Sequence, residues 1–329
     1  MLALAVWASL AVWTWVGTRV YVGEKVVPYE RRRPVPWGGI EVVLLLGMFL
    51  VGPPLIAFAG IHLFDIAVPG AEETAGESAD PSLQQFPGDS GEEAAGASAE
   101  KPADGRVEKP AEKRDTAHAV ERLLRQSRNL WVLALAALTA VLVAPIVEEF
   151  MFRVLFQGWL EKIENRYRRR MPGLRVLPGA MPVLLASVFF ASMHIRPAER
   201  EVDVDFLVFA LCCQMIASVI TMASSLLVLR FGSGATLSDM GFVRARFRGD
   251  VGLGLLAFLA VTAPVYLVFF ATEWVMPEGA VADPIPLILL AIVLGTLYYR
   301  THRIVPSIVL HMAFNATAVA MLVVAAFGK

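Results

Sequence analysis

Several uninterrupted apolar runs of about twenty residues constrain this chain more than any other feature of its sequence. As an α-helix, a run of that length spans the roughly 30 Å hydrocarbon core of a bilayer. Hydrophobic residues make up 57% of the 329 residues, above the roughly 45–50% that is usual in soluble domains. Within lipid, only helices and closed barrels satisfy their own backbone polar groups. The runs therefore predict an all-α fold, a polytopic transmembrane helical bundle.

We expect eight membrane spans. They are Leu2–Val22, Gly38–His62, Asn129–Val147 with an extension, Met181–Ile195, Phe206–Leu229, Val251–Thr272, Ile285–Tyr299 and Ile304–Phe327. The fourth and seventh are short for the bilayer core, which favours tilted or half-buried helices there. The first run has no basic segment before it and no small-residue cleavage site after it, so we interpret it as an uncleaved span.

The distribution of Lys and Arg predicts the orientation of the spans. Basic residues gather in alternate short loops: Lys25 and Arg31 to Arg33, Lys162 to Arg175, Arg244 to Arg248, and Arg300 with Arg303. The intervening loop Glu273–Asp283 contains acidic residues and neither Lys nor Arg. By the positive-inside rule, the basic loops face the cytoplasm and both termini lie outside. With the resemblance described below, this pattern predicts an integral protein of a bacterial inner (plasma) membrane.

A long polar segment divides the chain. From Asp65 to about Thr116 it is rich in Ala, Glu, Gly, Ser and Pro, with almost no large apolar residues. Such a composition cannot bury enough apolar surface to fold, so we expect an extracytoplasmic disordered linker. Residues 1–64 then form two N-terminal spans, 65–127 the linker and 128–329 a membrane domain. Cys212 and Cys213 are adjacent in an apolar run, which suggests neither a structural disulfide nor a cysteine metal site.

Two adjacent carboxylates, Glu148 and Glu149, lie at the end of the apolar run Leu130–Ile146, followed by Arg153. Ionisable groups at membrane depth are rare and usually functional. Glu149 and Arg153 are four residues apart and can pair on one helix face, whereas Glu148 points about 100° away from Glu149. Pro145 predicts a kink or local opening just before the pair. The alternative is a salt-bridge cluster that only marks the helix end.

Two further polar groups interrupt apolar spans, Phe190 with His194 and His311 with Asn315, and each pair shares a helix face. A lone histidine in an apolar helix is more often structural than catalytic. However, Glu148 and His194 lie up to ~20 Å along their helices from the basic loop that they share. His311 and Asn315 lie ~12 and ~18 Å past Arg303, measured from the same membrane face. The three groups can therefore meet at one depth in a single site that faces the cytoplasm.

Taken together, these motifs resemble the signature of the CAAX-protease and bacteriocin-processing (CPBP, or Abi) family of intramembrane proteases. The motifs are Glu148-Glu149-x-x-x-Arg153, Phe190-x-x-x-His194 and His311-x-x-x-Asn315. The resemblance covers roughly residues 129 to 315, looks closest to bacterial members and suggests a type II CAAX prenyl endopeptidase-like enzyme.

One feature departs from the family pattern. In the family, the stretch that resembles Ala235–Phe242, with its flanking spans, usually precedes the first motif. Here it lies between the second and third motifs, as a two-span inserted or rearranged segment at about residues 204–280. Because two spans are an even number, every later helix keeps its direction, and His311 still enters the membrane from the cytoplasmic side.

The resemblance implies an intramembrane endopeptidase that hydrolyses a peptide bond of a membrane-associated or lipidated protein or peptide. It implies that Glu148 activates the water as general base with His194 beside it. His311 and Asn315 would polarise the scissile carbonyl and stabilise the oxyanion. Glu149, Arg153 and Phe190 would support these four residues. The implied partners are the substrate and the lipid bilayer, and nothing in the sequence points to nucleic acid.

The sequence leaves other interpretations open. The family is often termed metalloprotease, and Glu148, His194 and His311 could together bind Zn²⁺. We favour a mechanism that requires no cofactor, because the resemblance gives Asn315 an oxyanion role and the sequence lacks His-Glu-x-x-His. From other functional classes, the alternatives are a proton-coupled transporter that uses Glu148 and His194 as a relay, and a non-catalytic membrane scaffold of the same fold.

Overall fold

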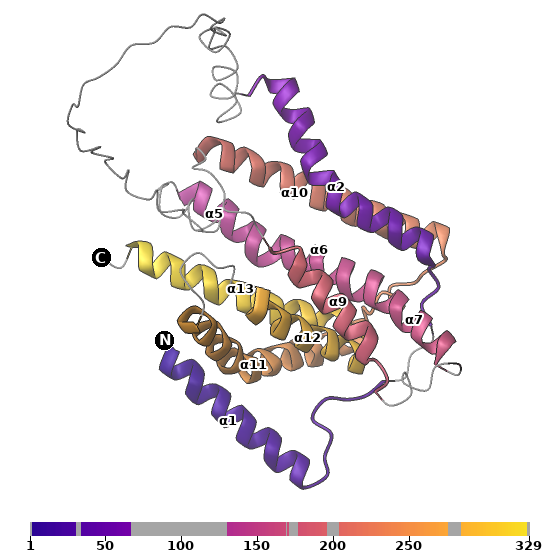
Figure 1. The fold of residues 1–329 in the computed structure, drawn as a ribbon, viewed down its shortest axis with the longest axis vertical. Coiled ribbons are helices and arrows are strands. Elements are labelled where there is room, and N and C mark those ends of the chain that lie inside the picture. Colours follow the sequence, from indigo (N-terminus) through magenta and orange to yellow (C-terminus); the bar gives the residue numbers. More distant parts are fainter. Residues whose placement is uncertain are drawn as a thin grey trace, which may run out of the picture.

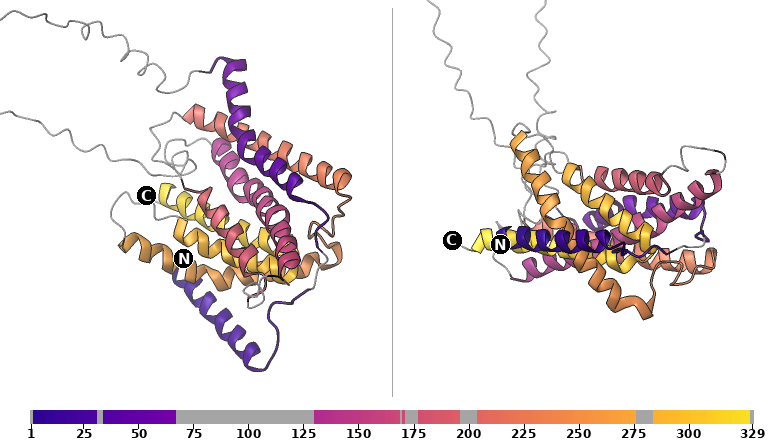
Figure 2. Two further views of the ribbon diagram at one scale, coloured as in Figure 1. Left: turned by 45° about the vertical axis from the view of Figure 1, so that its right-hand side comes forward. Right: turned by 90° about the horizontal axis from the view of Figure 1, so that it is seen from below.

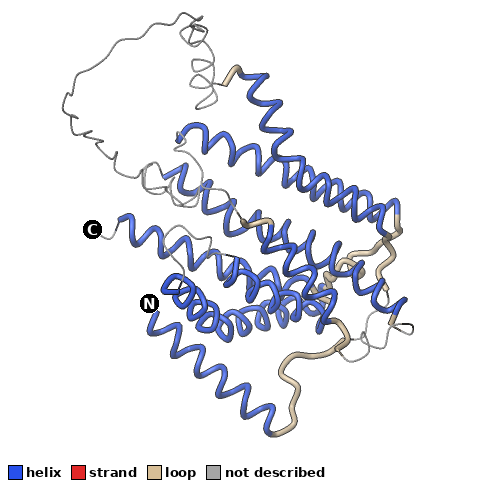
Figure 3. The backbone as a smooth tube through the Cα atoms, in the orientation of Figure 1, coloured by secondary structure: helices blue, strands red, loops and turns tan. Residues whose placement is uncertain are grey.

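The structure of the chain is a computed structural model, which describes residues 2–30, 34–66, 130–168, 170, 177–195, 204–275 and 284–327. All regular elements among these residues are helices, so the predicted all-α fold is confirmed (Figure 3). The helices before the linker are α1 (Leu2–Tyr21) and α2 (Gly39–Phe64). After the linker come α5 (Leu130–Leu138), η2 (Thr139–Val143), α6 (Ala144–Glu149), η3 (Phe150–Gln157), α7 (Gly158–Tyr167), α9 (Ala180–Ser192), α10 (Val204–Leu227), η4 (Val228–Gly232), η5 (Arg244–Arg246), α11 (Phe247–Val275), α12 (Pro284–Thr301) and α13 (Ile304–Phe327).

Six helical stretches of the described chain are long and apolar enough to cross a membrane. They are Gly39–Phe64, Leu130–Tyr167, Val204–Gly232, Arg244–Thr272, Pro284–Thr301 and Ile304–Val324. Helix α9 is shorter but apolar, as expected for the fourth predicted span, and α1 occupies the position of the first. Each of the eight expected spans thus corresponds to a helix, although the observed ends differ from the predicted ones by several residues.

The segment from α5 to α7 runs as one continuous helical rod through the centre of the bundle (Figure 1). Helices α9, α12 and α13 pack around it. Helix α2 lies along α10 at one edge, and α1 lies along α11 at the opposite edge (Figure 2). The two ends of the chain lie at the same end of the bundle (Figure 1). The two-span segment at about 204–280 therefore contributes a helix to each edge. The predicted linker, 65–127, lies almost entirely outside the described residues.

Two stretches of the central rod are π-helical, η2 before the acidic pair and η3 directly after it. A π-helix replaces the i→i−4 hydrogen bonds by i→i−5 bonds and is frequent at functional sites. The opening expected from Pro145 is found as η2, which ends two residues before that proline. The second stretch, η3, was not expected, because its sequence carries neither proline nor glycine.

The apolar core is built around η3. Met151, Val154 and Leu155 are fully buried there, in one cluster with Trp37. Trp37 belongs to the connection between α1 and α2, and its indole Nε1 donates a hydrogen bond to the carbonyl of Leu155 over 3.2 Å. Seven of the eight residues of η3 are buried, which restricts the movement of the helix that carries the acidic pair.

A tight loop fixes the start of α13, the helix that carries the third motif. The backbone amide of Ile304 donates to the carbonyl of Gly241 over 3.1 Å. Gly241 has φ +84°, and a Cβ atom there would lie 2.9 Å from the amide nitrogen of Ile304. Only glycine combines this backbone conformation with such a close approach. The stretch Ala235–Phe242 therefore packs against the start of α13 although it precedes that helix by about 60 residues.

Candidate active site

The two glutamates of the first motif occupy different environments. The side chain of Glu149 is fully buried, and its Oε2 accepts a hydrogen bond from Nε of Arg153 over 3.3 Å. The side chain of Glu148 keeps 20% of its surface exposed. The expected division is therefore present: one carboxylate is held within the core, and its neighbour faces an accessible space.

His194 follows the C-terminal end of α9 and faces Glu148. Its Nδ1 lies 2.8 Å from the carbonyl oxygen of Phe190. Because a carbonyl can only accept, Nδ1 carries the proton, and in the neutral ring Nε2 is then the free acceptor. This Nε2 lies 4.0 Å from Oε2 of Glu148, and 26% of the histidine side chain is exposed. His194 thus presents an available nitrogen to the accessible carboxylate.

His311, on α13, contacts both glutamates from the opposite side. Its Nδ1 lies 3.0 Å from Oε1 of Glu149, and its Nε2 lies 3.8 Å from Oε2 of Glu148. The ring is almost completely buried. Oε2 of Glu148 therefore has an Nε2 atom from each of two histidines at 3.8–4.0 Å. These distances exceed a direct hydrogen bond and suit groups that are bridged by one water molecule.

Phe190 forms the apolar floor of this cluster. Its ring is fully buried and packs against the rings of both His194 and His311, with centroid distances of 4.6 and 5.8 Å. The guanidinium carbon of Arg153 lies 5.4 Å from the same ring, within cation–π range. Phe190 therefore fixes the orientation of two histidines and one arginine at once.

Asn315 lies one turn beyond His311, but its contact is different from the one expected for an oxyanion donor. Its Nδ2 donates to the carbonyl of Ala140, in η2, over 2.8 Å. The structure describes no contact between this amide and Glu148 or the histidines. An amide nitrogen carries two protons, so one N–H of Asn315 is still available after the bond to Ala140. The third motif thus divides: His311 lies within the glutamate–histidine cluster, and Asn315 connects α13 to the π-helical opening.

The carboxylate and imidazole groups of the site are of the kind that bind metals. Among the described residues, no group of three or more His, Cys, Asp or Glu side chains has an arrangement that could hold a metal ion. Nδ1 of His311 is bound to Glu149 and Nδ1 of His194 to the carbonyl of Phe190, a pattern that zinc-bound histidines also show because it leaves Nε2 available. The side chains of the alternative zinc set, Glu148, His194 and His311, are nevertheless not arranged as a metal site in this structure.

Two buried polar residues on the central rod, beyond the first motif, were not expected from the sequence. Gln157 is fully buried and Glu161 nearly so, and they continue the spacing of four residues that starts with Glu149 and Arg153. The signal was present in that spacing, since residues four apart share a helix face. The spacing was not recognised because Glu161 lies in a charged stretch, and such a stretch is typical of a solvent-exposed helix end.

Comparison with known families supports the resemblance. The model of one family, described as type II CAAX prenyl endopeptidase Rce1-like, matches residues 129–233 and 240–317, which is more than half of the chain. The matched ranges include Glu148, His194 and His311, as well as most of the two-span segment at about 204–280. A search of curated proteins found no match, and a search of solved structures found none either. With the three motifs brought together on one helical membrane scaffold, the chain belongs to the Rce1-like family of type II CAAX prenyl endopeptidases.

Proposed function

We propose that this protein is an intramembrane endopeptidase that cleaves a membrane-associated or lipidated protein or peptide with a water molecule activated by Glu148. Membership of the Rce1-like family points to a peptidase in a bilayer. The observation that carries the mechanism is the convergence of the Nε2 atoms of His194 and His311 on Oε2 of Glu148.

In the proposed reaction, the attacking water lies between Glu148 and His194. Glu148 takes one proton from the water while the water oxygen bonds to the scissile carbonyl carbon. His194 accepts the second hydrogen bond of the water with Nε2 and orients it. When the tetrahedral intermediate collapses, the C–N bond breaks and Glu148 returns the proton to the leaving amine. The carboxylate is therefore regenerated and no other reactant is consumed.

In the same proposal, His311 and Asn315 stabilise the oxyanion. Because Nδ1 of His311 donates to Glu149, Nε2 can donate to an oxyanion only when the ring is an imidazolium. In this proposal the ring is therefore charged, and its Nδ1–H lies against the carboxylate of Glu149. Asn315 contributes the N–H that does not bind Ala140. A donor that is held in place before the reaction is typically worth about 10²–10³ in kcat.

Burial within the membrane domain suits a substrate that reaches the site from the bilayer. Glu148 and His194 are only partly exposed and are carried by apolar helices, which favours a peptide that is lipid-anchored or that spans the membrane once. We propose from the charge pattern that the site opens toward the cytoplasm and that the compartment is a bacterial inner membrane.

The direct test is cleavage by the purified protein in liposomes. Two substrates are offered, a peptide with a prenylated C-terminal Cys-a-a-X sequence and a single-span peptide, and the products are identified by mass spectrometry. We expect cleavage of at least one of the two by the wild-type protein and none by Glu148→Gln. If the folded wild-type protein cleaves neither, while a proton gradient drives uptake of a solute, the transporter is the better assignment. Binding of both peptides without cleavage would favour a scaffold.

A further inference from the structure

A row of buried polar side chains leads away from the site along one face of the central rod. Glu149, Arg153, Gln157 and Glu161 are spaced four residues apart, from the end of α6 through η3 into α7. Glu149, Arg153 and Gln157 are fully buried, and Glu161 is 9% exposed. Burying four polar side chains in an apolar bundle is costly unless each finds a partner. The contacts of Glu149 with Arg153 and His311 therefore do not explain why Gln157 and Glu161 are buried as well.

The middle of the row packs against α12. Nε2 of Gln157 donates to the carbonyl of Gly295 over 2.9 Å and to Oε1 of Glu161 over 3.1 Å. A Cβ atom on Gly295 would lie 3.0 Å from Oε1 of Gln157 and 3.3 Å from Nη1 of Arg153. Gly295 thus leaves room for both side chains against the backbone of α12.

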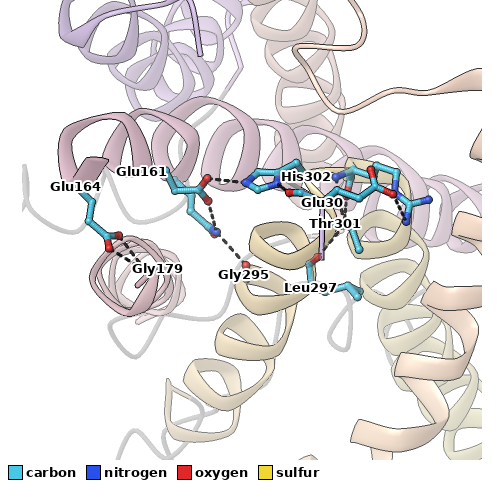
Figure 4. Close-up of polar contacts among 10 residues, drawn as sticks. Glu30, Glu161, Glu164, Gly179, Gly295, Leu297, Thr301 and His302 are labelled. Carbon is cyan, nitrogen blue, oxygen red and sulfur yellow. Dashed lines mark hydrogen bonds and ion pairs between the residues drawn. The ribbon is translucent and has the colours of Figure 1, made fainter. Parts of the chain in front are cut away.

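The far end of the row is His302, at the corner between α12 and α13. Its Nε2 lies 3.1 Å from Oε2 of Glu161, and its Nδ1 lies 2.8 Å from the carbonyl oxygen of Glu30 (Figure 4). His302 has φ +49°, a conformation that non-glycine residues rarely adopt. Side-chain contacts with two other segments compensate for this backbone cost.

Both ends of the row contact α13 or the residues directly before it. At one end Glu149 binds His311, on α13, and at the other Glu161 binds His302, two residues before α13 begins. Two attachments restrict sliding and rotation of one helix against another, whereas a single attachment leaves rotation about it possible. The helix that carries Glu148 and the helix that carries His311 are thus held in one relative position.

We propose that Glu161 and His302 are positioning residues for the peptidase reaction, which hold the Tyr167 end of the helix bearing Glu148 against the start of the helix bearing His311. This inference rests on the proposed function. It concerns residues more than two helical turns from Glu148, which contact neither the water nor the scissile bond. A displacement of about 1 Å in a catalytic arrangement can lower the rate by about 10²-fold, so a distant attachment is sufficient to control turnover.

The contacts of His302 also set a proton requirement. Both partners of His302, the carbonyl of Glu30 and the carboxylate of Glu161, accept hydrogen bonds. Both contacts therefore form only when the His302 ring is charged or the Glu161 carboxyl group is protonated, which is one proton more than a neutral imidazole and a carboxylate hold together. Without that proton, one of the two contacts cannot form. Among the described residues, the titratable or charged groups near the pair include Glu30, Glu164, Tyr298, Tyr299, Arg300, and Arg303 with its partner Asp250.

Glu161→Gln removes the charge of the carboxylate and can keep the contacts with Gln157 and His302. Its amide oxygen can accept from Gln157 while its amide N–H donates to Nε2 of a neutral His302, so every contact is satisfied without the extra proton. Glu161→Ala removes the contacts altogether. Glu24→Ala is the matched control, because Glu24 is exposed and its partner among the described residues is Arg19.

The experiment measures kcat and KM of the wild type and these three variants in liposomes. We expect Glu161→Ala to lower kcat by about 10–100-fold with little change in KM, and Glu161→Gln to restore it. Wild-type kcat in a folded Glu161→Ala would overturn the proposal, as would a folded Glu161→Gln whose kcat is as low as that of Glu161→Ala.

A second measurement does not depend on activity. Spin labels at Arg166 on α7 and Ala316 on α13, with Cys212 and Cys213 replaced by serine, report the distance between the two helices. The distribution of distances should broaden in Glu161→Ala and not in Glu161→Gln. If the wild type cleaves no peptide, the proposed function fails by that result alone, while an unchanged distribution in Glu161→Ala would overturn the attachment itself.

Discussion

Nδ1 of His311 lies 3.0 Å from Oε1 of Glu149, which joins the third motif to the buried half of the first. Glu149 is also bound by Arg153, so its two oxygens hold one partner each. The second glutamate of the motif therefore anchors His311, and of the pair only Glu148 is partly exposed, as the proposed mechanism requires.

Replacement of Glu148 by glutamine should abolish most of the activity without unfolding the protein. The amide keeps the size of the side chain but cannot take a proton from water, so kcat should fall by roughly 10²–10⁴-fold. Because Glu148 is partly exposed and makes no hydrogen bond shorter than 3.5 Å to either histidine, abundance and thermal unfolding should change little. The measurement is steady-state cleavage, with Glu24→Gln as the control. Activity within a factor of two of the wild type would assign the base to another group.

Arg153→Ala should lower abundance as well as activity. It would leave the carboxylate of Glu149 buried with only His311 as partner, and removing one member of a buried pair typically costs about 3–5 kcal/mol. The measurement is the amount of folded protein in the membrane together with its thermal unfolding. Arg248→Ala, at an exposed position of α11, is the control and should behave as the wild type. A fully stable but inactive Arg153→Ala protein would instead indicate direct contact of Arg153 with substrate.

Asn315→Ala should lower kcat by about 10²–10³-fold if the amide supplies an oxyanion donor, with KM nearly unchanged. The substitution also removes the hydrogen bond to Ala140, so thermal unfolding must be measured on the same sample. Thr317→Val is the control, since the hydroxyl of Thr317 bonds only to the carbonyl of Ala313 in its own helix. A loss of stability with normal turnover in the remaining folded protein would limit Asn315 to its contact with η2.

The sequence predicted the parts of this protein that depend on local patterns. Apolar runs located the helices, and the shared depth of Glu148, His194 and His311 predicted their convergence, because helix rise per residue is constant. The π-helical register of η3 could not be predicted, since it depends on how that segment packs in the core. The bond from Asn315 to Ala140 and that from Glu161 to His302 join residues more than 100 positions apart, and no local pattern encodes such pairs.

The charge alternation predicts the orientation of the chain. Reporter fusions should place Arg168 and Arg246 in the cytoplasm, and Glu92, which lies outside the described residues, on the opposite side. The reason is that basic loops are retained on the cytoplasmic side during insertion. A fusion at Glu24, in the first basic loop, serves as the internal control and should report the cytoplasm. Arg168 on the outside would invert the protein and open the site to the wrong compartment.

Metal content distinguishes the two mechanisms that the sequence left open. Under the glutamate–histidine mechanism, protein purified without added metal contains no stoichiometric zinc and keeps its activity after thorough chelation, because Glu148 itself activates the water. A zinc enzyme would contain about one equivalent, and His194→Ala would weaken its binding markedly. Loss of activity in His194→Ala cannot decide between the mechanisms, since both require that ring. The measurements are elemental analysis of the active protein and activity after chelation, with and without returned zinc. Stoichiometric zinc, with activity lost on chelation and restored by the metal, would replace the proposed water activation by Glu148 and leave the assignment to the peptidase family intact.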